Sequence, residues 1–187
     1  MKTLVLLPLV IVFGCSDRAA TPAAVDSGQT DGSPTDDAHV DQTMPDSATD
    51  SAVCNTLDLT GVAAVTLTQV AGDAPSAAGG TVADGTYLLT KYTLYTGPGG
   101  PTGSLPLSVK ARRQFSAGVV QTIQADGDGS NVVRFTATFS AATSNFTEMH
   151  TCGGTAVDRG TYSATSSTLI EWTTDRGMVV EATFTMQ

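Results

Sequence analysis

VRFTATF at Val133–Phe139 and MVVEATFTM at Met178–Met186 alternate apolar and polar residues along most of their length. Successive side chains of a β-strand point to opposite faces of the sheet, so a period of two predicts strands with one face in a core. The residues predicted to face the core are Val133, Phe135, Ala137, Phe139, Met178, Val180, Ala182, Phe184 and Met186.

The same alternation, interrupted by turn residues at short intervals, continues from Cys54 to Gln187, and no segment of helical period competes with it. Strands are expected at about nine places, namely 62–70, 85–96, 107–115, 118–125, 132–139, 144–152, 160–165, 168–173 and 178–186. Short connections favour an up-and-down antiparallel barrel or sandwich. A barrel is preferred, because closing the sheet removes its exposed edges.

The first fifteen residues predict export. Met1–Gly14 has a basic start, an apolar run and a small residue at its end, which is typical of a signal peptide. The run is too short to span a bilayer core of about 30 Å. Val12-Phe13-Gly14-Cys15 resembles the lipobox of bacterial lipoproteins, which implies a lipid on the sulfur of Cys15. An ordinary signal peptide whose cysteine lies just past the cleavage site is the alternative.

Residues 15–53 are expected to be a disordered spacer. Asp26, Asp31, Asp36, Asp41 and Asp46 recur every five residues, which matches neither a helix face nor strand alternation. The segment also has too little apolar surface to offset the entropy of ordering it. The predicted organisation is therefore a signal peptide at 1–14, a lipidated acidic linker at 15–53 and a β-barrel domain at 54–187.

Charge and cysteine content limit the partners. The net charge of −9 argues against nucleic acid and anionic lipid headgroups, because both would repel the chain. The lipid on Cys15 would then supply membrane attachment, and Ser16 after it favours the outer membrane under the best-known Gram-negative sorting rule. Cys54 and Cys152 remain as a pair, and an oxidising compartment predicts a disulfide between them. A thiol or metal site is the alternative.

Two further stretches carry resemblances. Gly160–Thr165, with Leu169-Ile170 and Gly177–Gln187, resembles the closing hairpins of small lipocalin-like barrels. That resemblance implies a barrel and, for a carrier, an apolar cavity. Gly79–Tyr87 resembles uncharacterised lipoproteins of Gram-negative, myxobacteria-like bacteria, which brings no known activity.

No catalytic, metal or cofactor site is predicted. His150 is the only histidine of the domain, and alternation places Glu148 and Cys152 on its face of the strand. A metal site needs three or four ligands, so this face offers too few once Cys152 is bridged. No G-x-S-x-G elbow is present to raise a serine for hydrolysis. Asp126–Asn131 begins like a calcium loop, but Asn131 stands where the loop requires glycine, so a hairpin turn is expected.

A ligand cavity is the main functional hypothesis. Small residues lie in the middle of three inward-facing runs, at Ala111, Ala137 and Ala182. If the strand register brings them level, they would leave space in a barrel of about eight strands. The cavity would be lined by Phe135, Phe139, Val180 and Phe184, with the inward-facing Arg113 near one end. A buried guanidinium must be paired. The alternative is that large neighbours fill the gap.

These patterns favour a lipid-anchored envelope protein of Gram-negative bacteria whose β-barrel binds rather than catalyses. The expected partner is a small apolar ligand, an acidic ligand of Arg113, or another envelope protein. A structural, adhesive or inhibitory surface protein is the alternative, and a hydrolase is the reading that the residues support least.

Overall fold

The computed structural model describes residues 54–187. The predicted signal peptide, the predicted lipid site at Cys15 and the acidic residues up to 53 lie outside the described residues. The described chain forms nine strands: β1 (Val65–Val70), β2 (Gly85–Tyr95), β3 (Gly103–Ser116), β4 (Val119–Asp126), β5 (Val133–Ala142), β6 (Asn145–Cys152), β7 (Val157–Ala164), β8 (Thr168–Asp175) and β9 (Met178–Met186).

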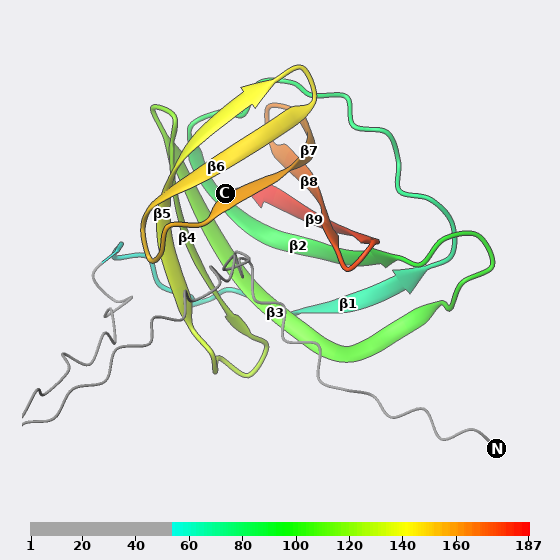
Figure 1. Cartoon of the computed structure of the whole chain (residues 1–187). Coiled ribbons are helices and arrows are strands. Elements are labelled where there is room, and N and C mark those ends of the chain that lie inside the picture. The colour runs from blue at the N-terminus through cyan, green and yellow to red at the C-terminus, as the bar shows by residue number, and fades with distance from the viewer. Residues whose placement is uncertain (1–53) are drawn as a thin grey trace, which may run out of the picture.

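The strands form one sheet that closes on itself (Figure 1). From β2 to β9 each strand pairs antiparallel with the next, and β9 pairs antiparallel with β2. This confirms the predicted all-β, barrel-like fold with its predominantly antiparallel order. Closure leaves the strands of the ring without an unpaired edge, which is the physical benefit that favoured a barrel.

Strand β1 departs from the expected meander. It runs parallel to β2 and antiparallel to β3, and it lies between them. Strands β2 and β3 pair directly only where Gly85–Leu88 meets Arg112–Phe115, and beyond this point they separate. The apolar strand β1 fills the gap, with Leu67 fully buried. Residues 71–84 allow this arrangement, because they are long enough to return the chain to the other end of the barrel before β2 begins.

Two hairpin turns show how local sequence fixes the register. Ala117 and Gly118 have φ angles of 49° and 77°, and Arg176 and Gly177 have φ angles of 48° and 82°. Positive φ at both central residues is the type I′ geometry, whose twist matches that of the flanking strands. Glycine at the second position adopts this region without a steric penalty. Both turns join pairs of strands that the sequence predicted.

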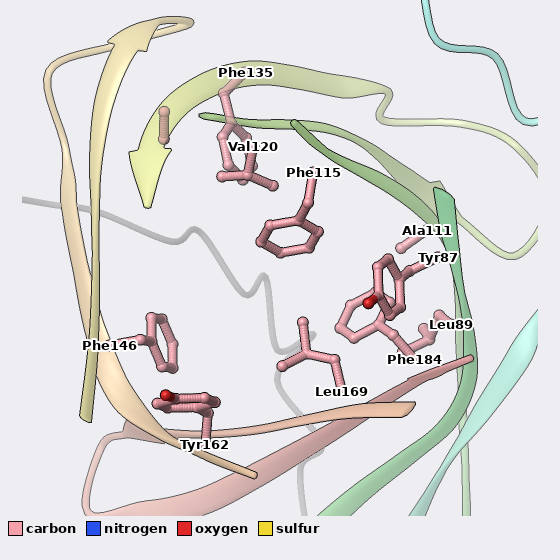
Figure 2. Packing of buried hydrophobic residues seen from close by; sticks show 11 residues of the cluster. Tyr87, Leu89, Ala111, Phe115, Val120, Phe135, Phe146, Tyr162, Leu169 and Phe184 are labelled. Atoms are coloured by element: carbon pink, nitrogen blue, oxygen red, sulfur yellow. The ribbon is translucent and has the colours of Figure 1, made fainter. Parts of the chain in front are cut away.

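Aromatic and aliphatic side chains fill one end of the barrel (Figure 2). Phe139 packs edge-on against Phe115 and Tyr162, and it stacks on Phe146. Ala137 lies in the same cluster and is fully buried. The smaller cluster at the other end comprises Leu67, Tyr92, Leu94 and Val180.

The segment 71–84 caps the aromatic end. Gly79 donates its N–H to the carbonyl of Tyr162 and accepts from the N–H of Ala164. The hydroxyl of Tyr162 donates to the carbonyl of Gly80. A Cβ on Gly79 would lie 1.8 Å from the carbonyl oxygen of Thr143, and its φ of +70° also favours glycine. The segment therefore seals this end only because its backbone approaches the barrel without side chains.

The N-terminal residues of the domain cross the outer face of the barrel. Cys54 is bonded to Cys152, with 5.4 Å between their Cα atoms, which confirms the predicted disulfide. The side-chain amide of Asn55 donates to the carbonyls of Thr122 and Phe135. These contacts fix the approach of the chain to β1.

A β-bulge corrects one sequence prediction. His150 lies opposite the inward-facing Ala137, whereas Cys152 lies opposite Thr136, with a register shift between them. Thr136 faces outward, and its hydroxyl donates to the carbonyl of Cys54. The expectation that Cys152 shares a face with Glu148 and His150 is therefore wrong, because the extra residue of the bulge turns the cysteine toward the outer face.

We predict that the Cys54→Ser/Cys152→Ser double variant loses about 2–4 kcal/mol of unfolding free energy, because the bridge closes a long loop in the unfolded chain. The two cysteines are 98 residues apart. Urea denaturation of the variant and of the oxidised wild type measures the difference. Equal midpoints and slopes would show that the bridge contributes nothing.

Candidate functional site

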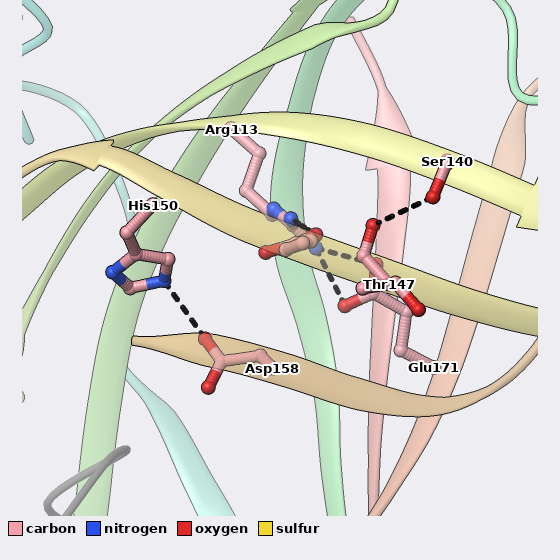
Figure 3. A network of polar contacts seen from close by, with 7 residues as sticks. Arg113, Ser140, Thr147, His150, Asp158 and Glu171 are labelled. Atoms are coloured by element: carbon pink, nitrogen blue, oxygen red, sulfur yellow. Dashed lines mark hydrogen bonds and ion pairs between the residues drawn. The ribbon is translucent and has the colours of Figure 1, made fainter. Parts of the chain in front are cut away.

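A buried ion cluster lies inside the barrel (Figure 3). Arg113 on β3 is 4% exposed, and its Nη1 donates to both carboxylate oxygens of Glu171 on β8, each at 2.5 Å. Its Nη2 donates to Glu148 on β6. One guanidinium thus joins three strands across the interior. The two carboxylates satisfy the pairing that burial of an arginine requires.

A second polar pair lies beside this cluster. Nε2 of His150 is 2.9 Å from Oδ2 of Asp158 on β7. The imidazole stacks on Phe135, with the ring centroids 4.3 Å apart. Asp158 lies directly opposite Glu148 in the β6–β7 register, so the two carboxylates share one region of the interior.

Negative charge exceeds positive charge in the ion cluster. Burial acts to lower the pKa of Arg113, but the attraction of Glu148 and Glu171 outweighs burial and raises it. Burial raises the pKa of Glu171 to about 7, although the charge of Arg113 opposes this rise, and repulsion by Glu148 and Asp158 adds to it. One guanidinium therefore cannot fully compensate the carboxylates that face it.

The cluster forms part of the wall of an interior cavity of about 90 Å³ that is partly open to solvent. The remaining wall is mainly apolar and aromatic. The lining residues are Leu89, Tyr92, Val109, Ala111, Arg113, Thr122, Gln124, Phe135, Phe146, Glu148, Asp158, Glu171, Thr173, Val180, Ala182 and Phe184.

Two buried polar atoms of this wall have no hydrogen-bond partner within residues 54–187. They are the hydroxyl oxygen of Thr122 and Nε of Arg113. The two residues are direct cross-strand partners on β3 and β4, so their side chains lie side by side. Leaving a buried polar group unpaired costs about 1–3 kcal/mol. A molecule in the cavity that bonded to both atoms would remove that cost.

The structure brings most of the residues predicted for a cavity to one place. Those that line it are Ala111, Arg113, Phe135, Val180, Ala182 and Phe184. Ala137 and Phe139 do not line it and belong to the packed aromatic end. Ala137 is opposite Val120, which is opposite Phe115, so it lies four residues along β3 from Ala111. The three alanines are therefore not level, because the register staggers one of them.

Sequence analysis placed Glu148 on the face of His150 but did not identify Glu171 as facing inward. Glu171 alternates with Leu169 and Thr173, whereas the more apolar set of this strand contains Ile170 and Trp172. The more apolar residues of this strand therefore point to the outer face of the barrel. Trp172 is buried there, with 6% of its surface exposed. Trp172 lines a surface hollow together with Ala74 and Pro75 of the 71–84 segment. A covered outer face gives a strand no simple alternation, so the inward glutamate was not recognised.

Glu181 occupies the outer face beside Trp172. Its carboxylate accepts hydrogen bonds from Trp172 Nε1 at 3.1 Å, and from Lys91 Nζ and the Tyr95 hydroxyl at 2.7 Å each. Burial acts to raise the pKa of Glu181, but the bonds from Lys91 and Tyr95 outweigh it, and the pKa is lowered. This buried glutamate is fully partnered and lies outside the cavity.

Residues 54–187 lack the features of two other kinds of site. Within this part of the chain, no group of three or more His, Cys, Asp or Glu side chains is placed to hold a metal ion. None of the described segments forms a helix with the length and hydropathy needed to span a lipid bilayer.

Comparisons with protein-family models, with curated proteins and with solved structures gave no match to this chain. The chemistry of the site is therefore inferred from the residues that line the cavity.

We predict that the stability of the protein falls with rising pH through the titration of Glu171. Between pH 4.5, the ordinary pKa of a glutamate, and about 7, the folded protein keeps a proton that the unfolded chain has lost. The stabilising contribution of this carboxyl is therefore fully present below this window and is lost as pH rises through it. Arg113, Glu148 and Asp158 face the same carboxyl, and His150 pairs with Asp158.

Urea denaturation at about pH 5 and about pH 8 tests this prediction. Wild type should lose stability relative to Glu171→Gln over the interval, because the variant has no proton to release. Glu181→Gln is the matched control, since the lowered pKa of Glu181 keeps that buried carboxylate ionised throughout the interval. A constant difference between wild type and Glu171→Gln would contradict the raised pKa.

Proposed function

We propose that residues 54–187 form a non-catalytic binding domain that takes a small ligand into the interior of the barrel, and that a lipid on Cys15 holds this domain at the cell envelope. The observation that carries the binding role is the interior cavity, whose wall includes Thr122 and Arg113, two residues with buried polar atoms that lack partners within residues 54–187. A domain that only filled its core would gain stability by replacing such groups with apolar side chains.

The volume of the cavity sets the size of the ligand. A water molecule occupies about 30 Å³ in the liquid, and an apolar cavity of about 150 Å³ accepts benzene. A cavity of about 90 Å³ therefore suits a molecule of a few heavy atoms. Drug-sized pockets measure about 300–1,000 Å³, so a whole fatty acid or a comparable apolar carrier ligand would not fit.

The charges of the cavity wall limit the chemical class of the ligand further. An acidic ligand would find both Nη atoms of Arg113 already bonded to glutamates, with only Nε left to donate a hydrogen bond. A second anion would also be repelled by Glu148, Asp158 and Glu171. The cavity therefore favours a neutral or cationic ligand over an acidic one.

A surface role is a second candidate, favoured by one observation on the outer face. Val119, Met149 and Val157 are exposed, and Thr138 links them, because it lies opposite Val119 on one side and Met149 on the other. Met149 is in turn opposite Val157. This apolar row across β4 to β7 would suit the structural, adhesive or inhibitory alternative, with its contact on the outside of the barrel.

We predict that wild-type protein purified from its own envelope retains a small molecule in native mass spectrometry and that Ala182→Leu does not, because the added side chain enters the cavity. Ala137→Leu is the matched control, since Ala137 faces inward but lies outside the cavity wall. It should cost about 1–3 kcal/mol by overpacking. Ala182→Leu should cost less, because it fills existing space.

Equal destabilisation by the two substitutions would show that the space beside Ala182 is already filled. Equal ligand retention by wild type and Ala182→Leu would show that any bound molecule lies elsewhere, and would favour the surface role.

We predict that Cys15→Ser releases the protein from membranes or leaves it unprocessed, because buried acyl chains supply the free energy of anchoring at about 0.8 kcal/mol per CH₂ group. Fractionation of cells that express wild type or the variant measures the effect. Unchanged membrane association of the variant would defeat the lipid anchor without affecting the cavity.

A further inference from the structure

We infer that the interior cavity binds a small amino alcohol, a molecule with a protonated amine and a hydroxyl on a short carbon chain. This inference rests on the proposed binding function and names the chemical class of the ligand. It follows from which hydrogen-bonding groups line the cavity, which of them lack partners, and how much space they enclose.

The carboxylates of the cavity wall favour a ligand with a cationic hydrogen-bond donor. Glu148, Asp158 and Glu171 all line the cavity, and one guanidinium is shared between two of them. His150 pairs only with Asp158 among these carboxylates. A buried charge without compensation is unfavourable, so an ammonium group beside these carboxylates would be stabilised by both charge and hydrogen bonds.

The two unpartnered atoms, Nε of Arg113 and the hydroxyl oxygen of Thr122, favour a second polar group on the same ligand. Nε of Arg113 can only donate a hydrogen bond, whereas the hydroxyl of Thr122 can donate or accept. The two residues are cross-strand partners and both line the cavity, so a ligand oxygen held between their side chains would bond to both. An ammonium could not accept from Arg113, but a hydroxyl oxygen could. The site thus requires an amine for its acidic side and a hydroxyl for its Arg113–Thr122 side.

Size and the remaining wall select a short stem between these two groups. The space of about 90 Å³ admits only a few heavy atoms. Phe135, Phe184 and Val180 complete the wall with apolar surface, against which methylene groups pack favourably. A two-carbon stem, as in ethanolamine, satisfies all three requirements.

Four probes of nearly equal size separate these contributions. Ethanolamine carries both groups, propylamine lacks the hydroxyl, ethylene glycol lacks the charge, and glycolate replaces the ammonium with an anion. Binding of each to the full chain in detergent is measured by calorimetry and by chemical-shift changes. We expect ethanolamine to bind most tightly, with a loss of about tenfold or more for ethylene glycol, since charge-assisted bonds are lost.

Two variants assign the preference to particular residues. Glu148→Gln should reduce the preference for ethanolamine over ethylene glycol, because it removes a negative charge. Thr122→Val should instead reduce the preference for ethanolamine over propylamine, because it removes only the hydroxyl contact. Glu181→Gln, on the outer face, is the control and should leave both preferences unchanged. Each variant is compared with wild type by its thermal unfolding, so that a loss of folding is not read as a loss of binding.

The affinity of ethanolamine should also rise from about pH 6 to about pH 8, where the ligand remains cationic. A bound cation favours the ionised form of Glu171, whose pKa is raised to about 7 by burial, and Arg113, Glu148 and Asp158 are the other charged groups that face it.

The outcomes distinguish this inference from the function on which it rests. Equal binding of ethanolamine and ethylene glycol, or tighter binding of glycolate, would overturn the amino alcohol while leaving a ligand-binding barrel. Equal binding of ethanolamine and propylamine would overturn the role of the Arg113–Thr122 side. If no probe binds but native protein retains another molecule, the ligand class is wrong and the binding function stands. If no probe binds and nothing is retained, both are wrong.

Discussion

Arg113 shares its single positive charge between two buried carboxylates, and the organisation of the barrel interior depends on this arrangement. The guanidinium reaches from β3 to Glu148 on β6 and Glu171 on β8, across the ring. Taking three charged groups out of water costs several kcal/mol per ion, and their mutual attraction repays this only in part. The raised pKa of Glu171 is the direct consequence of that shortfall. A barrel that needed only stability would be better served by apolar side chains at these positions.

The rest of the fold holds this cluster in place. The aromatic end supplies a packed core, and the glycine-rich segment 71–84 seals it. Strand β1 fills the gap between β2 and β3, and the Cys54–Cys152 bridge fixes the chain that leads to β1. A cavity remains beside part of the aromatic cluster, where the small side chains of Ala111 and Ala182 and the rings of Phe135, Phe146 and Phe184 meet the ion cluster. The packed aromatic end thus supports the buried charges and the cavity beside them.

Alternation along Met178–Met186 and Val133–Phe139 predicted the strands, and cysteine pairing predicted the bridge, because these depend on local spacing and on residue chemistry. The same alternation correctly turned Arg113 inward. It failed where a bulge shifts the register, as at Cys152, and where a distant segment covers the outer face, as at Trp172. The roles of Glu171 and Thr122 could not be predicted from local spacing, because they depend on the strand arrangement that places both side chains beside Arg113. Ala137 was misplaced for the same reason, since sequence spacing does not give the stagger between strands.

The central claim is that the ion cluster serves binding at the expense of stability. Its most direct test is the triple variant Arg113→Met/Glu148→Leu/Glu171→Leu, for which urea denaturation and retention of the native ligand are measured together. The account predicts that the variant folds with at least the stability of wild type and no longer retains the ligand. A strongly destabilised variant, or one that is stable and binds as wild type does, would contradict it.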